Sequence, residues 1–457
     1  MSSRVRRAEV PGRVSPPVLL LRPDARLRWD VLEDHFEDAC FLSSQWERAL
    51  LSARYTLTEV ARGHERRLRA HLDGLVVGGP EVDARLLEPA LTEEDGEKVR
   101  VATSVLLQRA DGKGVASVLA LLRQGEEVRR AAARALGLSE RPGLSEHLSR
   151  VLEAREEPEV VAAAVEALCV HGAAPGPLRL ARLLAHPEPE VRLAALGAAR
   201  RWPGEVEANE VCRVLASPAP RLRAAALVAG LVSGQFTVWR ACQYAAEALD
   251  VAGRTARLLL ALGGDTDEVA RLVKLLEVPL LRGDTLWALG FSGRRLAAEA
   301  CLPWLGDASL GRLAAEAFCA ITGLQLEKRY ARSPTGEDTL PLDEDGCTHL
   351  LPGLEEDLSL PDAAEVERWW AEARKDFDGQ MRYLGGQPFS AIRLLDTLES
   401  CSMRRRPVLS LELAIRTGGA HVVETRTWAC VQERQLAAAR AWRGGSTLQP
   451  FATWMRR

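Results

Sequence analysis

The residues of this chain that could do chemistry are its histidines, its carboxylates and a recurring set of arginines. A serine nucleophile would need a Gly-x-Ser-x-Gly turn, and a phosphate loop would need Gly-x-x-x-x-Gly-Lys-Ser/Thr. Neither pattern occurs in the 457 residues. His64 and His71 are spaced to share one helical face, but no HExxH or His–Cys spacing accompanies them. The sequence therefore names no catalytic, cofactor-binding or metal-ligating residue, and we expect no cofactor and no enzyme.

The arginines recur at one position of a repeated pattern, directly after its first apolar residue. They are Arg100, Arg129, Arg192, Arg223 and Arg282. One interpretation is a basic stripe on the inner surface that binds an acidic peptide or a phosphate backbone. The other is a structural ladder, in which each arginine pairs with an acid of a neighbouring turn. The acids available for that pairing are Glu126, Glu157, Glu188 and Asp284. We favour the structural ladder.

Three tryptophans, Trp239, Trp287 and Trp304, fall within the repeated helices. We expect them in the core. Tryptophan is enriched among the residues that dominate binding energy at protein interfaces. Any of the three that projects from a concave surface would therefore be a candidate contact for a partner.

The elements that must position these residues are helices. The repeated pattern begins at Val99, Val128, Val160, Val191, Leu222, a degenerate Arg254, Leu281 and Leu310. Each copy has apolar residues at spacings of three and four, which predicts an amphipathic helix, and a weaker helix precedes each copy. We therefore predict an all-α fold, an α-solenoid of about eight short HEAT-like helical hairpins over residues 80–323. Glycines such as Gly137, Gly172 and Gly264 are expected to end the second helices in a left-handed conformation.

The two ends of the chain differ from the repeats. Residues 1–22 are rich in Pro and Arg and are predicted to be disordered, and residues 23–79 are predicted to form an N-terminal helical cap. Residues 324–364 are predicted to be an acidic linker, since 333–367 hold eleven acidic residues and no Lys or Arg. That stretch is either a solvated linker or an arm that docks on a basic surface. Residues 365–457 are predicted to form a Trp-rich helical region.

Composition narrows the possible partners and locations. The formal net charge of −3 argues against a nucleic-acid binder, which usually carries a strong positive field. We find no signal peptide and no apolar run long enough to span a membrane, so we expect a cytoplasmic protein. The nine cysteines show no CxxC pair and indicate no disulfide framework. The scarcity of Lys and Asn beside abundant Arg, Ala and Gly favours a bacterial origin.

Two resemblances follow from these motifs. The short period and the Val-Arg-x-Ala-Ala-x-x-Ala-Leu core over 80–323 resemble the HEAT repeats of phycobilisome lyase-type proteins. The segment near residue 41 and the tracts at 381–400, 403–416 and 424–429 resemble a proteobacterial, myxobacterial-type family of HEAT-repeat proteins. Members of that family are often encoded near type VI secretion and PAAR-like genes, so the resemblance implies a protein partner from that setting. It supplies no catalytic or binding residues.

Three functional hypotheses remain at this point. The favoured one is a protein-binding scaffold or adaptor, associated with type VI secretion or effector handling, that is not an enzyme. The second is a nucleic-acid-binding or DNA-repair protein that uses the arginine ladder, as some HEAT-like DNA glycosylases do. The third is a bilin lyase or chaperone, by analogy with the proteins that share the repeat.

Overall fold

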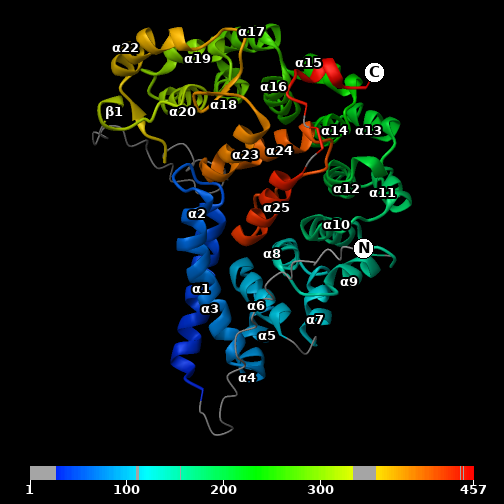
Figure 1. The fold of residues 1–457 in the computed structure, drawn as a ribbon. Helices are drawn as coiled ribbons and strands as arrows, with labels where there is room; N and C mark the ends of the chain where they lie inside the picture. Colours follow the sequence, from blue (N-terminus) through cyan, green and yellow to red (C-terminus); the bar gives the residue numbers. More distant parts are fainter. Residues whose placement is uncertain are drawn as a thin grey trace, which may run out of the picture.

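The computed structural model describes residues 27–456, except 110–112, 155, 333–356, 443 and 446. The predicted disorder of 1–22 and most of the predicted acidic linker lie outside this range. The described chain is predominantly helical and forms a curved solenoid (Figure 1). The predicted all-α class and the predicted repeat architecture are therefore confirmed. None of the described helices is long and apolar enough to cross a membrane.

An inner row of helices carries the repeated pattern, and each helix packs against the next along the row. In chain order they are α6 (Gly96–Gln108), α8 (Glu126–Leu138), α10 (Pro158–His171), α12 (Pro189–Arg201), α14 (Pro220–Val232), α16 (Val251–Gly263), α18 (Arg282–Ser292) and α20 (Gly311–Thr322). Many of their buried residues are alanines, which let neighbouring helices approach closely.

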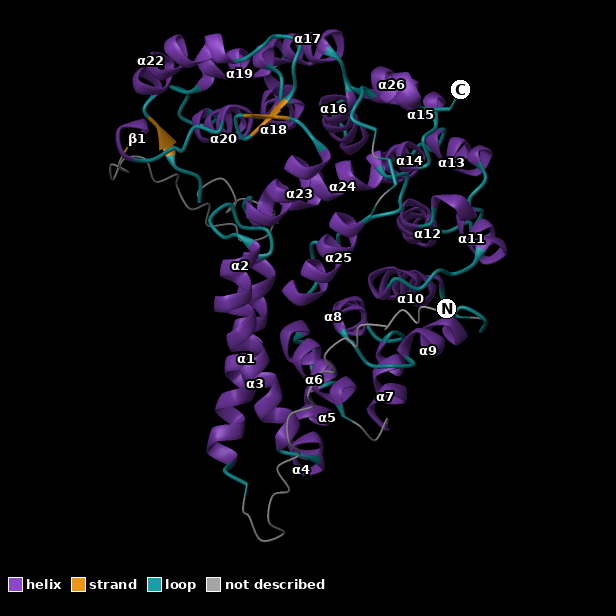
Figure 2. Cartoon of the chain, viewed as in Figure 1, coloured by secondary structure: helices purple, strands orange, loops and turns teal. Residues whose placement is uncertain are grey.

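A second, outer row precedes the inner helices one by one. Its first member is a single helix made of α4 (Pro80–Val82), a π-helical turn (Asp83–Leu87) and α5 (Glu88–Ala90). The others are α7 (Lys113–Leu121), α9 (Leu144–Val151), α11 (Pro177–Leu184), α13 (Ala208–Leu215), α15 (Phe236–Ala245), α17 (Thr266–Lys274) and α19 (Arg295–Cys301). Figure 2 shows the two rows as an arc of helical hairpins.

Proline marks the start of several inner helices, and glycine follows the end of others. Pro158, Pro189 and Pro220 lie in the first turn of inner helices, where a missing backbone N–H costs nothing. Gly172 follows α10 with a φ of 72°, in the left-handed region that favours glycine, as predicted.

The predicted left-handed cap is wrong at two of the other glycines. Gly264 follows α16, but with a φ of −75°, which any residue can adopt. Gly137 lies inside α8, and a Cβ added there would make an ordinary contact with the side chain of Val170 at 3.4 Å. Neither a left-handed turn nor a close approach explains this glycine.

The N-terminal end of the arc is covered by a helical hairpin, as predicted. It consists of α1 (Trp29–Ala49) and a second helix formed by α2 (Leu57–Val60), a π-helical turn (Ala61–Glu65) and α3 (Arg66–Val77). The second helix begins with a capping box, in which Thr56 and Glu59 bond reciprocally to each other's backbone. Both helices pack on α6.

The C-terminal part of the chain folds back into the arc. Its elements are β1 (Ala331–Arg332), β2 (Leu360–Pro361), α22 (Ala363–Ala373), β3 (Tyr383–Leu384), β4 (Gln387–Pro388), α23 (Ala391–Ser400), α24 (Arg406–Arg416), α25 (Ala429–Ala441) and α26 (Phe451–Trp454). The strands form two short antiparallel pairs, β1–β2 and β3–β4. Figure 1 shows α23, α24 and α25 on the inner side of the arc. We call residues 377–456 the inner segment.

Candidate functional site

The ladder arginines mostly bond to their own turns. Nη1 of Arg129 donates to the carbonyl of Gln124 at 3.0 Å, and Nε of Arg282 donates to the carbonyl of Leu276 at 2.9 Å. These carbonyls lie in the segment between the outer and the inner helix of the repeat. The side chains therefore stabilise the turn between the two helices of a repeat.

Two of the remaining three ladder arginines, Arg223 and Arg100, also bond to groups of the chain. Arg223 bonds to the carbonyl of Ser217 at 2.9 Å and forms an ion pair with Asp250 at 2.5 Å. Arg100 donates to the hydroxyl of Ser43 at 2.8 Å, and Arg192 is half-buried. None of these contacts is with the acids that the sequence suggests.

Asp284, one of those suggested acids, pairs instead with Arg254 and Arg257. Four of the five ladder guanidiniums thus contact groups of their own chain.

The three tryptophans have different surroundings. Trp239 is buried, and its ring meets that of Phe451 in the inner segment at 5.7 Å between centroids. Trp287 lies under the guanidinium of Arg404, also in the inner segment, at 4.5 Å. Trp304 is half-buried against Arg282. Two of the three therefore contact the inner segment.

Three of the eight histidines, including the two that are spaced to share a helical face, lie in the N-terminal hairpin. The Nδ1 atoms of His71 and His35 lie 3.0 Å apart, and the ring of His64 packs on Tyr55. Burial lowers the pKa of both His64 and His71. Within the ranges that the structure describes, no three His, Cys, Asp or Glu side chains gather as metal ligands.

The inner segment is bonded to the ends of the inner helices. Nη2 of Arg416 donates to the carbonyl of Leu262 in α16 at 3.1 Å, and Nη2 of Arg405 donates to that of Gly290 in α18 at 2.8 Å. The indole N–H of Trp428 donates to the carbonyl of Leu138, the last residue of α8, at 2.8 Å. Because helix C-termini carry unsatisfied carbonyls, these donors both anchor the inner segment and cap the helices.

A buried ion-pair triad holds the inner segment together. Glu412 is fully buried and accepts from Arg382 at 2.9 Å and from Arg416 at 2.7 Å. Burial alone would raise the pKa of Glu412, but the two guanidiniums outweigh it, and that pKa lies below its usual value. Arg382 also donates to the carbonyl of Phe291 at 2.9 Å, which links the triad to α18.

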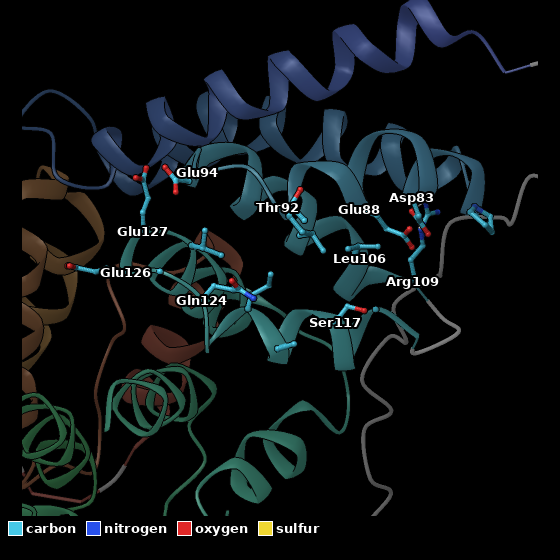
Figure 3. Close-up of a pocket in the computed structure, with 17 residues that line it drawn as sticks. Asp83, Glu88, Thr92, Glu94, Leu106, Arg109, Ser117, Gln124, Glu126 and Glu127 are labelled. Atoms are coloured by element: carbon cyan, nitrogen blue, oxygen red, sulfur yellow. Dashed lines mark hydrogen bonds and ion pairs between the residues drawn. The ribbon is translucent and has the colours of Figure 1, made fainter. Parts of the chain in front are cut away.

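A cleft of about 1110 Å³ opens between the first two outer helices, far along the sequence from the inner segment. Its walls are the first outer helix, the loop that leads into α6, the end of α6, α7 and the start of α8. Figure 3 shows Asp83, Glu88 and Arg109 toward one end, and Glu94 and Glu127 toward the other. The cleft is thus a feature of the solenoid's N-terminal half.

The cleft carries an excess of negative charge. Five carboxylates line it, those of Asp83, Glu88, Glu94, Glu126 and Glu127, and one guanidinium, that of Arg109. Arg109 is neutralised by Asp83 at 2.6 Å. Glu88, Glu94 and Glu126 are exposed and form no ion pair with any described residue. The arrangement suits a cationic ligand.

The walls of the cleft are hydrogen-bonded to one another and partly apolar. Arg109 also donates to the carbonyl of Gly79 at 2.7 Å, so the end of α6 is fixed to the first outer helix. Leu106 and Leu121 contribute apolar surface between the acidic ends. The π-helical turn at Asp83–Leu87 forms part of one wall, and such turns are frequent at functional sites.

Sequence reasoning did not identify this cleft. Its acids are spread along the sequence at 83, 88, 94 and 126–127, and only the packing of the repeats brings them to one opening. The one signal in the sequence was the acidic run at 93–95 directly before the first repeat helix.

Helical repeats define the fold class of this protein. No family model and no curated protein matches the chain. A structure of the Escherichia coli protein YibA is 14% identical with a TM-score of 0.28, and the match covers 65% of this chain and 98% of YibA. The CpcE–CpcF complex of phycocyanin lyase from Nostoc is 20% identical with a TM-score of 0.27, covering 51% and 86%.

Human deoxyhypusine hydroxylase, solved in complex with glycerol, is also similar. It is 18% identical with a TM-score of 0.19, and the match covers 63% of this chain and 95% of the hydroxylase. At these identities and TM-scores the likeness assigns no property to this chain.

The comparisons correct one expectation. The prediction that the chain is not an enzyme is wrong as drawn, because the solved structures that it resembles include a lyase and a hydroxylase. The absence of known catalytic motifs from a helical-repeat sequence is no ground for excluding catalysis. The low identities equally assign no activity to this chain.

Proposed function

We propose that this protein is a binding scaffold of helical repeats and that its partner protein binds at the acidic cleft. The proposal rests on a difference between two surfaces, the inner side of the arc and the acidic cleft. The inner side of the arc is filled by the chain's own inner segment, through contacts such as those of Trp428 and Arg416. The cleft, in contrast, is left open by the described residues and carries three carboxylates, those of Glu88, Glu94 and Glu126, that form no ion pair with any of them.

The chemistry of the cleft supports a protein or peptide ligand. Its volume of about 1110 Å³ lies near the upper end of the range for ligand pockets, roughly 300–1000 Å³, and leaves room for a peptide segment. Its charge excludes anionic ligands such as a phosphate backbone. A type VI secretion component or effector is one partner of the right kind, and that suggestion rests on the sequence resemblance alone.

Site-specific photo-crosslinking in the producing cells tests the proposal. A photoreactive amino acid replaces Ser117 or Gln124, both exposed at the cleft. It also replaces Ser149, on the outer helix α9 and away from the cleft lining, as a control. We expect one adduct of defined mass from both cleft positions and none from Ser149. Equal labelling at all three positions, or none at any, would count against a partner in the cleft.

A further inference from the structure

We infer that the exposed face of helix α1 is a dimer interface, on which α1 of a second copy of this chain packs antiparallel. The inference goes beyond the proposed function and does not depend on it, because this face belongs to the N-terminal hairpin and not to the cleft. Figure 1 shows α1 and α3 side by side at the N-terminal end of the arc. The support comes from the spacing, the charge and the apolar centre of the exposed face.

A stripe of exposed residues runs along α1 at alternating spacings of four and three. We call Asp34, Asp38, Phe41, Gln45 and Arg48 the α1 stripe. Four of these residues are exposed, and Gln45 is half-buried. The opposite face of α1 is buried against α3 and α6. Alternation of four and three is the spacing at which two helices pack side by side, and no described helix packs on this stripe.

The charges of the α1 stripe are arranged about Phe41 with opposite signs at the two ends. Asp34 lies seven residues before Phe41 and Arg48 lies seven residues after it, about two helical turns in each direction. When two copies of α1 pack antiparallel about a twofold axis at Phe41, Asp34 of each copy faces Arg48 of the other. A parallel pair would bring like charges together. The charge pattern therefore fits a second copy in the antiparallel orientation.

The polar groups flanking the stripe agree with the same arrangement. Glu37, four residues before Phe41, is exposed and would face Gln45 of the second copy, four residues after it. The second helix of the hairpin runs antiparallel to α1, so the exposed Arg62 near its start lies beside the C-terminal half of α1. Neither Glu37 nor Arg62 forms an ion pair with a described residue. Each end of the hairpin thus offers charge that the other end of a second copy neutralises.

Phe41 supplies an apolar centre for this interface. It is 62% exposed, whereas the other seven phenylalanines of the chain are buried or half-buried. Residue 41 is the one position of the stripe that meets its own counterpart across the twofold axis, so the two rings pack against each other and leave water. An aromatic residue at the centre with polar groups around it is typical of protein interfaces.

The size of the interface sets the expected affinity. Helix α1 has 21 residues and is therefore about 31 Å long at 1.5 Å per residue. An interface of one helix from each copy belongs to the weak class, which buries below about 1200 Å². We expect a dissociation constant in the micromolar range that rises with salt, because exposed ion pairs are screened. Dimerisation brings two copies of every other surface of the chain into one particle.

Sedimentation equilibrium of the full chain over a range of concentrations tests the inference. The test variants are Asp34→Arg and Arg48→Glu, and each places like charges at both contacts of its own dimer. The matched control is Glu146→Arg, at an exposed position on α9. We expect the dissociation constant of the dimer to rise at least about tenfold in each test variant, since like charges opposed at an interface are strongly unfavourable. The control should match the wild type.

A mixture of the two test variants separates a lost interface from a damaged fold. In the mixed pair, opposite charges meet at both contacts, so an equimolar mixture of Asp34→Arg and Arg48→Glu should dimerise about as well as the wild type. Phe41→Ser should weaken the dimer and leave the thermal unfolding of the monomer unchanged, because the ring is exposed in the monomer.

A wild-type chain that stays monomeric up to about 100 µM, well above a micromolar dissociation constant, would overturn the inference. A dimer that both test variants retain would place the interface elsewhere and overturn it too, as would a mixture that stays monomeric. Crosslinking from Ser117 and Gln124 reports on the cleft, so the partner proposed for the cleft and the dimer are tested separately.

Discussion

At the scale of single residues, the inner segment depends on charges that are buried and paired. Glu412 and Arg416 are almost fully inaccessible to water, and each has partners with good geometry. A buried ion pair adds little net stability compared with an apolar pair, but removing one partner leaves a buried charge without compensation. Such residues therefore respond strongly to single substitutions.

Glu412→Gln should lower the free energy of unfolding by about 3–5 kcal/mol, because Arg382 and Arg416 would lose their common counter-charge. Denaturant titration monitored by tryptophan fluorescence measures this change. The control is Glu399→Gln, since Glu399 is exposed and pairs with Arg440 at the surface. That change should cost below about 1 kcal/mol. Similar losses in both variants would contradict a special role for the triad.

Acidification should weaken the same triad. The pKa of Glu412 is lowered in the folded protein, so its stabilisation is complete above its unfolded value of 4.5 and is lost as pH falls through the lower folded value. Unfolding midpoints should therefore fall steeply below about pH 4.5 in the wild type. Glu412→Gln should show a shallower decline over that range. Parallel pH curves for the two proteins would argue against the assignment.

At the scale of elements, the local pattern predicted the repeats but not the inner segment. Each inner helix contains its own apolar stripe and boundary residues. The residues around Val128 and Val160 therefore predict their helices from local spacing alone, without reference to contacts with distant parts of the chain. The inner segment is placed by contacts such as Trp428 with Leu138, 290 positions apart in the chain. No spacing rule encodes such a contact.

The candidate site was predictable only in part, for a similar reason. The sequence suggests Glu126 as a partner for a ladder arginine, whereas the structure places it exposed at the cleft. The π-helical turn at Asp83–Leu87, which shapes one wall, carries no glycine or proline of its own to mark it.

Adding one methyl group to Gly263, the last residue of α16, should displace helix α26. A Cβ at Gly263 would lie 1.9 Å from the ring of Phe451, so Gly263→Ala should displace α26 at a cost of about 1–3 kcal/mol. The backbone bond from Phe236 N–H to the carbonyl of Arg456 would break with it. Hydrogen exchange of residues 451–456 should then accelerate.

Gly197 offers the matched control for that substitution. It lies within α12, and a Cβ added there would meet no atom within 4 Å, so Gly197→Ala should stabilise the protein by about 0.5–1 kcal/mol through helix propensity. Unchanged exchange in Gly263→Ala would show that α26 is held elsewhere.

At the scale of the whole molecule, the inner segment turns an open solenoid into a closed assembly. In most repeat proteins each unit contacts only its neighbours, and stability is a sum along one axis. Here Met403 N–H bonds to the carbonyl of Tyr55 at 2.8 Å, and Ala429 N–H bonds to Glu65 at 2.8 Å, so the C-terminal part holds the N-terminal hairpin. We therefore expect the described chain to unfold as one cooperative unit.

Trp428 is the residue on which this closure most depends. Its ring stacks on that of Trp46 in α1 at 4.5 Å between centroids, and Arg69 lies over it at 4.4 Å. Trp428→Ala should cost about 3–5 kcal/mol and separate the hairpin from the inner segment. Thermal unfolding should split into two transitions, and small-angle scattering should show a larger radius of gyration. Trp304→Ala, at a half-buried site against Arg282, should keep a single transition and the native radius. A single transition with an unchanged radius in Trp428→Ala would mean that the repeats themselves, and not the inner segment, hold the arc in shape.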